Sequence, residues 1–290
     1  MRHHSAAAAL LSVLVAAPAG AQAVLDWPLV LEARPAPLIT GSGALLTNPA
    51  GVAALDQRAE GLVSDLETPD EMGLRALTIA GAVRLLERWT VGAAYRHIGV
   101  GDMLRTDGPP LGDSPRPLEI GEDVFALGVG VRFGDVTAGA AGRLDTPAED
   151  LQGDESWAGT LGAGYAPALP IGALRLAASL EVEEEERAIA FAAEAGAPPL
   201  LDGRLALAFA WGAAQHGPLG LSHSVVGSGT WRGLAELQVG ASGQPGAAER
   251  EWVPLLAALL HLGRYRLGVV REHLPNGFGA ATHYRLSVAF

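Results

Sequence analysis

The chain contains one group of residues whose types would suit a hydrolase. Ser222-His223-Ser224 places two hydroxyl nucleophiles beside an imidazole base. A hydrolytic triad needs serine, histidine and a carboxylate to converge in space. Adjacent residues of a strand point to opposite faces, so these neighbours cannot form such a pair with one another. We therefore predict that the chain is not an enzyme and has no catalytic residues.

Metal and cofactor chemistry also finds little support. The histidines lack metal-like spacing, cysteine is absent, and the glycines around Val129 are not followed by the helix that a phosphate loop needs. The acidic run from Glu181 to Glu186 fits a solvated outer turn, or alternatively a place where divalent cations bridge lipopolysaccharide phosphates. We predict no metal site and no cofactor.

A third set of residues carries charge along one face of alternating segments. If the bulky apolar face meets lipid, the opposite face holds mostly alanine, glycine, serine and threonine, together with charged residues that would then face the lumen. These lumen-facing charges are Arg96, Arg132, Arg143, Arg175, Glu181, Arg204, Arg232, Glu236, Arg266, Glu272 and Arg285. They either pair across the lumen and brace the wall, or line a polar pathway. A charge facing mid-membrane lipid costs about 2–4 kcal/mol, so this segregation favours a stable barrel.

Alternation with a period of two residues defines the elements that would hold these charges. The clearest segment is 125–133, with Phe125, Leu127, Val129, Val131 and Phe133 on one face, and it is followed by a turn at Gly134-Asp135. Further segments are read at 59–66, 74–83, 89–98, 136–144, 157–165, 174–182, 188–194, 205–211, 218–226, 231–241, 252–262, 265–271 and 282–290. About fourteen strands of about ten residues match the length of tilted membrane strands.

Connection lengths and tryptophan positions favour a membrane barrel over a sandwich. Connections alternate between short ones, such as Gly134-Asp135 and Gly227 to Gly229, and longer ones, led by Gly99 to Glu119. Five tryptophans fall at predicted strand ends, where an interfacial girdle would lie: Trp89, Trp157, Trp211, Trp231 and Trp252.

The start of the chain and its overall charge indicate where the protein would reside. Residues 1–23 read as a signal peptide, with Arg2, an apolar run and an Ala21-Gln22-Ala23 cleavage site. No later stretch is apolar over the 18 residues of a spanning helix, so a closed barrel is the remaining way to cross a membrane. A net charge of -12 argues against nucleic acid as a partner. We predict localisation in the outer membrane of a Gram-negative bacterium.

Residues 24–57 differ from the rest because they lack a strand period and contain Asn48-Pro49-Ala50-Gly51. This motif resembles the N-terminal region of the long-chain fatty-acid transporter (FadL-like) family and of the related PorV/PorQ-type barrels. The resemblance implies that residues 24–57 form a hatch inside a barrel of residues 58–290, and that hydrophobic molecules pass towards a lateral opening. Asn48 and Pro49 would form a well-ordered turn, or alternatively contact the ligand.

Three functional hypotheses follow. The first is an all-β, antiparallel transmembrane barrel with a hatch segment, which transports small hydrophobic compounds across the outer membrane. The second is a PorV-like barrel that docks secreted or surface proteins through its outer loops, and the third is a soluble exported β-sandwich. Outer-membrane lipid and lipopolysaccharide are expected partners. The barrel assembly machinery is another, because the last strand ends in an aromatic residue, Phe290, as its recognition signal would.

Overall fold

The computed structural model describes residues 32–69, 73–100, 120–147, 155–183, 186–216, 220–243, 252–273 and 279–290. The predicted signal peptide, the first residues of the 24–57 segment and nearly all of the Gly99 to Glu119 loop lie outside these ranges. No helix in the described ranges has the length and apolar character needed to span a membrane.

Three short 3-10 helices precede the strands: η1 (Ala36–Leu38), η2 (Ser42–Leu46) and η3 (Pro49–Ala54). Fourteen strands follow in the described residues, and all the pairs between them are antiparallel. They are β1 (Ala59–Glu67), β2 (Leu74–Arg84), β3 (Trp89–Val100), β4 (Ile120–Phe133), β5 (Val136–Pro147), β6 (Ser156–Tyr165), β7 (Ala173–Glu183), β8 (Glu186–Gly196), β9 (Leu205–His216), β10 (Gly220–Trp231), β11 (Ala235–Gly243), β12 (Trp252–Leu262), β13 (Tyr265–His273) and β14 (Ala280–Ala289).

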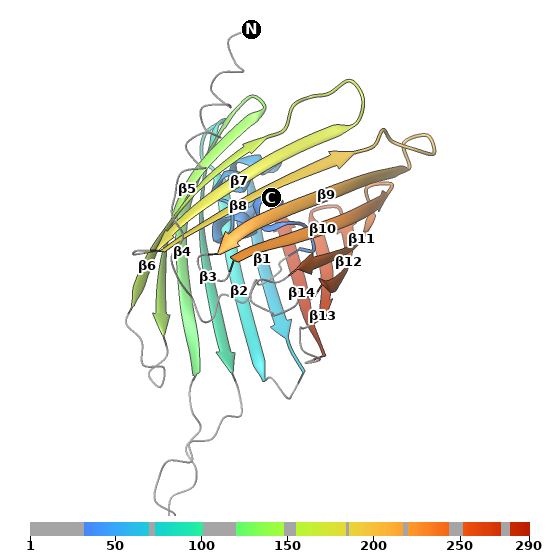
Figure 1. Cartoon of the computed structure of the whole chain (residues 1–290). Helices are drawn as coiled ribbons and strands as arrows, with labels where there is room; N and C mark the ends of the chain where they lie inside the picture. The colour runs from blue at the N-terminus through green and yellow to red at the C-terminus, as the bar shows by residue number, and fades with distance from the viewer. Residues whose placement is uncertain are drawn as a thin grey trace, which may run out of the picture.

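The strands form a closed barrel, as the sequence predicts (Figure 1). Each strand pairs with its neighbours in the chain, and β1 closes the ring on β14 with Glu60 opposite Ala289. The last residue takes part in this closure, because the backbone N–H of Phe290 donates to the carbonyl of Ala59. A closed ring leaves no unpaired strand edge, which is the condition for crossing a bilayer with strands.

Large apolar side chains cover the outer face of the barrel. In several strands they alternate with buried neighbours, as in β4, where Leu127 is 70% exposed and Ala126 is buried. Trp89 and Trp231 lie at the strand ends near the short turns, and Trp157 and Trp252 lie near the opposite ends. The two pairs therefore mark two belts at the edges of the apolar band, which is the aromatic girdle of a membrane barrel.

Two details of the predicted strands are wrong. Gly227 to Gly229 were expected to form a turn, but these residues lie inside β10, and the turn is made by Arg232, Gly233 and Leu234. Arg232 and Gly233 have positive φ angles, of 50° and 65°, and the backbone N–H of Leu234 donates to the carbonyl of Trp231 at 2.9 Å. Trp211 was expected at a strand end, but β9 continues five residues beyond it to His216.

Candidate functional site

The candidate site is the surface on which the N-terminal segment, described from residue 32 to 57, meets the inner face of the barrel wall. The helix η3 packs against β4, β5 and β6, while η2 contacts β1 to β4 and η1 contacts β7 and β8. Figure 1 shows the blue coils of this segment among the strands. Its residues Leu38, Leu45 and Val52 are fully buried by these contacts.

Asn48 organises the segment. Its side-chain Oδ1 accepts a hydrogen bond from the backbone N–H of Ala50 at 3.1 Å, which caps η3, and Pro49 occupies the first helical position. Its Nδ2 donates to the carbonyl of Pro37 at 2.9 Å and to that of Ala163 on β6 at 3.4 Å. The residue therefore joins η3, η1 and the wall. Its side-chain oxygen and nitrogen both form hydrogen bonds to backbone groups.

Glycines on the wall give η3 the room to approach. A Cβ atom placed at Gly130 would lie 2.8 Å from the backbone nitrogen of Ala53, and one at Gly139 would lie 2.6 Å from that of Ala50. Within the segment, a Cβ at Gly51 would collide with the carbonyl of Ile39. Gly51 of the sequence motif is thus required by close approach of the backbone to itself.

Ion pairs anchor the start of the described segment to strands on different sides of the ring. Glu32 binds Arg285 of β14, and Arg34 binds Glu236 of β11 at 2.8 Å and Glu194 of β8 at 3.3 Å. Burial opposes the charge of Glu32, but Arg285 and Arg34 outweigh it and hold the pKa of Glu32 below its ordinary value. Burial likewise opposes the charge of Arg34, and the surrounding glutamates raise its pKa.

Two wall residues, Arg175 and Glu60, hold the segment at further points. Arg175 of β7 donates to the carbonyl of Leu38 at 2.9 Å, and its other terminal nitrogen lies 3.4 Å from Glu194. On the opposite side, the hydroxyl of Ser42 donates to Glu60 of β1 at 3.0 Å. Charge-assisted hydrogen bonds are the stronger class of polar contact, so these few points hold the segment in a defined position.

A second charge cluster lies on the inner face of the wall, towards the ends with the long connections. Arg143 of β5 binds Asp145 at 2.7 Å, Glu181 at 3.0 Å and Glu183 at 3.1 Å. The hydroxyl of Ser156 adds a 2.6 Å hydrogen bond to Glu183. The cluster links β5, β6 and β7 across the wall, as the bracing interpretation of the strand charges requires.

The remaining predicted lumen-facing charges occupy different places. Arg96 and Arg266 are half-buried on β3 and β13, and Glu272 of β13 is buried. Arg132 is exposed near a turn, where its Nε donates to the carbonyl of Gly134 at 3.3 Å. Arg204 and Arg232 lie in the turns before β9 and after β10 and are exposed, so the structure does not place them on the inner wall.

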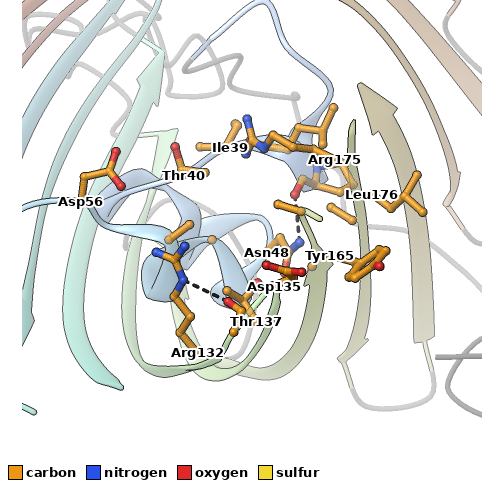
Figure 2. Close-up of a pocket in the computed structure, with 18 residues that line it drawn as sticks. Ile39, Thr40, Asn48, Asp56, Arg132, Asp135, Thr137, Tyr165, Arg175 and Leu176 are labelled. Atoms are coloured by element: carbon orange, nitrogen blue, oxygen red, sulfur yellow. Dashed lines mark hydrogen bonds between the residues drawn. The ribbon is translucent and has the colours of Figure 1, made fainter. Parts of the chain in front are cut away.

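A cavity of about 270 Å³ lies where the segment meets β5 to β7 near the short turns. Pro37, Ile39 and Thr40 form its wall on one side, and Thr137 and Arg175 face them from the barrel. Figure 2 shows Asn48 in the centre, with Ile39 and Arg175 above it and Asp135 and Arg132 below. The cavity mixes apolar and charged groups and is bounded by the segment itself, so any movement of the segment changes its shape.

The inner wall is divided into a polar and an apolar part. Buried apolar side chains on β10, β12 and β13 form one cluster with Ala33, and those on β1, β2, β3 and β14 form another. The first contains Val226, Leu255, Ala257, Leu259 and Val270, and the second contains Leu66, Leu74, Ala76, Ile98 and Ala281. Alternation alone predicted an inner face of small and polar residues, so these two clusters were missed.

The anchoring residues Glu32, Arg34 and Glu194 were also missed by sequence reasoning. A signal was present, because Glu32 and Arg34 are charged residues within a segment that is otherwise mostly apolar. The hydrolase hypothesis gains nothing, since Ser222 donates to the carbonyl of Ala214 and His223 stacks on Trp211 with ring centroids 6.3 Å apart. Among the described residues, no group of three metal-ligating side chains comes together.

Comparison with solved structures supports the fold. The structure is similar to that of outer membrane protein Omp33 from Acinetobacter baumannii, with a TM-score of 0.52, 8% identity and coverage of 81% of this chain and 98% of that one. OprB from Pseudomonas putida gives a TM-score of 0.45 at 8% identity over 81% and 92% of the two chains. A mutant porin of Rhodopseudomonas blastica gives 0.44 at 10% identity over 80% and 98%.

The last two similarities are too distant to carry an argument. Neither a protein-family model nor a curated protein sequence matches the chain. The chain therefore has the fold of an outer-membrane β-barrel.

Proposed function

We propose that this chain is an outer-membrane barrel that carries small hydrophobic compounds towards the periplasm, with residues 24–57 acting as a hatch that moves to open the path. The observation that carries this proposal is the two-part inner wall beside the anchored segment. An aqueous pore needs polar lining, whereas buried leucine, isoleucine and valine side chains on the inner face suit an apolar solute.

The hatch contacts suit movement as well as closure. The ion pairs of Glu32 and Arg34 and the hydrogen bonds of Arg175 and Ser42 are few and reversible, and apolar helices separate them. A segment held in this way can be displaced as a unit without breaking the strand pairing. The strands pair in a continuous ring, so we propose a path along the barrel axis that ends beside the cavity at the short turns.

Uptake by reconstituted vesicles tests the proposal. Vesicles containing the mature chain should take up the hydrophobic dye N-phenyl-1-naphthylamine faster than empty vesicles, while arabinose should enter both at the same rate. Equal entry of the dye with and without the protein would exclude hydrophobic transport. Rapid entry of arabinose would indicate an open aqueous porin.

The alternative of a barrel that docks secreted or surface proteins depends on the loop between β3 and β4, which lies outside the described residues. Removing residues 102–116 separates the two proposals. Dye uptake should survive this deletion if the barrel is a transporter. Loss of partner capture with no measurable uptake in either form would favour docking.

A further inference from the structure

The inner wall contains two buried ionisable side chains that have no hydrogen-bond or ion-pair partner among the described residues. Glu272 of β13 and His283 of β14 are each 1% exposed, and both face inward. Within the part of the chain that the structure describes, the Oε2 atom of Glu272 and the Nε2 atom of His283 make no hydrogen bond. Burying a carboxylate or an imidazole without a partner is costly, and most buried polar groups in proteins are hydrogen-bonded. The burial of Glu272 and His283 without partners therefore indicates a role other than stabilising the fold.

Strand register places this pair between the two apolar clusters. Glu272 lies opposite Leu255 on β12 and opposite Ala281 on β14. His283 lies opposite Val270 on β13 and opposite Leu66 on β1. The two polar side chains are thus flanked on both sides by the apolar wall, in the arrangement of a site that binds an apolar molecule through one polar group.

The charge of the surrounding wall indicates the sign of that polar group. In the half of the inner wall near the long connections, the described side chains include five carboxyl groups and two guanidinium groups. The carboxyl groups belong to Glu122, Asp145, Glu181, Glu183 and Glu272, and the guanidinium groups to Arg96 and Arg143. Arg143 is engaged by Asp145, Glu181 and Glu183. An excess of carboxylates attracts cations and repels anions along this part of the path.

We propose that Glu272 and His283 bind the ammonium group of a hydrophobic amine, and that the apolar clusters on either side receive its hydrocarbon part. The Glu272 carboxylate accepts a charge-assisted hydrogen bond from the ammonium group, and the His283 ring nitrogen accepts a second. The inference rests on the proposed transport function and names its substrate class.

The position of the pair also relates it to the hatch. His283 and Arg285 share the inner face of β14, and Arg285 holds Glu32. A molecule that reaches Glu272 and His283 therefore lies next to the anchor of the hatch.

Calorimetric titration of the mature chain in lipid nanodiscs tests the subsite. Hexylammonium, hexanol and hexanoate serve as probes, because they share one hydrocarbon part and differ in charge. Hexylammonium should bind more tightly than the other two. Glu272→Gln keeps the shape and removes the charge, so it should weaken hexylammonium binding by about tenfold or more and leave hexanol binding unchanged.

Two further variants separate binding from structure. Glu272→Met removes a buried group without a partner, so it should abolish the preference for hexylammonium without lowering the temperature at which the barrel unfolds on gel electrophoresis. Thr78→Val, a near-isosteric change of a buried inner-wall residue on β2, should leave all three affinities unchanged. A structural role for Glu272 would instead lower the unfolding temperature of Glu272→Met.

The possible outcomes are distinct. Equal hexylammonium affinity in the wild type and in Glu272→Gln, or a wild type that prefers hexanol or hexanoate, would overturn the subsite while dye uptake still supports transport. Hexylammonium binding that depends on Glu272, in a protein that takes up no dye, would support the subsite and exclude the transport function.

Discussion

Glu32 and Arg285 form the most buried ion pair among the described residues, with side chains 6% and 1% exposed. Such a pair contributes little net stability when it is intact, but removing one partner leaves an uncompensated buried charge. Two further nitrogens of Arg285 have no hydrogen-bond partner in the described ranges. Its position on the wall therefore depends on the carboxylate that the N-terminal segment supplies.

We expect Glu32→Gln to loosen the seating of the segment by about 3–5 kcal/mol, because Arg285 loses the counter-charge that Glu32 supplies. Hydrogen–deuterium exchange of the amides in η2 and η3 should speed up accordingly, while exchange in the strands stays slow. The double variant Glu32→Leu with Arg285→Met serves as the control and should exchange more slowly than Glu32→Gln. Unchanged exchange in Glu32→Gln would show that the pair does not hold the segment.

The pKa of Glu32 predicts an acid dependence. Burial opposes its ionisation, but Arg285 and Arg34 lower its folded pKa below the ordinary glutamate value. Between the lowered pKa and the ordinary pKa of glutamate, Glu32 binds more protons when the segment is released than when it is seated. Seating is therefore stabilised at higher pH. This contribution is complete above the ordinary glutamate pKa and is lost as the pH falls through the lowered one.

Single-channel conductance measures this effect. Conductance of the wild type should rise as the pH is lowered below the ordinary glutamate range, whereas Glu32→Gln should conduct more already at neutral pH. The other carboxylates of the anchorage, Glu60, Glu194 and Glu236, are present in both proteins, so the difference between the two isolates Glu32. Identical pH profiles for the two proteins would contradict this role of Glu32.

At the scale of elements, the seat of η3 depends on small residues of the wall. Gly139 faces the start of η3, whereas nothing lies within 4 Å of the Cβ position of Gly142, on the same strand. Gly139→Val should therefore displace η3, and Gly142→Val is the matched control with the same change in strand propensity. We expect faster exchange of the η3 amides in Gly139→Val alone, with both barrels remaining folded. Equal exchange in the two variants would mean that η3 does not depend on this close approach.

Much of the strand architecture could be predicted from the sequence, because large apolar side chains on the outer face alternate along the strands with smaller or polar side chains on the inner face. The hairpin of β4 and β5 is the clearest example, with its turn at Gly134-Asp135 in the expected place. The turn near Gly227 was misplaced because glycine was taken as a turn signal, although a glycine can also lie inside a strand. Local composition could not reveal that Arg232 adopts a positive φ angle.

Contacts between the N-terminal segment and the wall could be predicted far less well. The Asn48 motif indicated an ordered turn, and its side chain does bond to nearby backbone groups. The pairing of Glu32 with Arg285, however, joins residues 253 positions apart. No spacing rule connects such residues, since their proximity arises only when the ring closes and the segment folds back against it.

At the scale of the whole molecule, the barrel combines an apolar outer face with an inner wall that is charged in one part and apolar in another. The outer face is apolar between two aromatic belts, which fits the bilayer. The inner wall has ion pairs on some strands and buried leucine, isoleucine and valine on others. The anchored segment contacts both parts, so in the proposed transport mechanism its position determines whether a solute can move along the apolar part.

An engineered disulfide bond between the N-terminal segment and the wall tests whether the segment must move for transport. The chain has no cysteine, so a disulfide can be introduced without side reactions. A Cβ atom at position 130 would lie 3.0 Å from the Cβ atom of Ala53, slightly below the usual disulfide range of about 3.5–4.5 Å, so a small shift allows the bond. Ala53→Cys with Gly130→Cys therefore joins η3 to β4. Ala258→Cys with Val269→Cys, directly opposite on the outer faces of β12 and β13, is the control.

Uptake of N-phenyl-1-naphthylamine by vesicles with each locked protein is the most direct test of the hatch. In the Ala53–Gly130 variant, oxidation should reduce dye uptake to the level of empty vesicles, and a reducing agent should restore it. The Ala258–Val269 control should take up dye equally in both states. Undiminished uptake through the oxidised Ala53–Gly130 variant would contradict the claim that displacement of this segment opens the barrel.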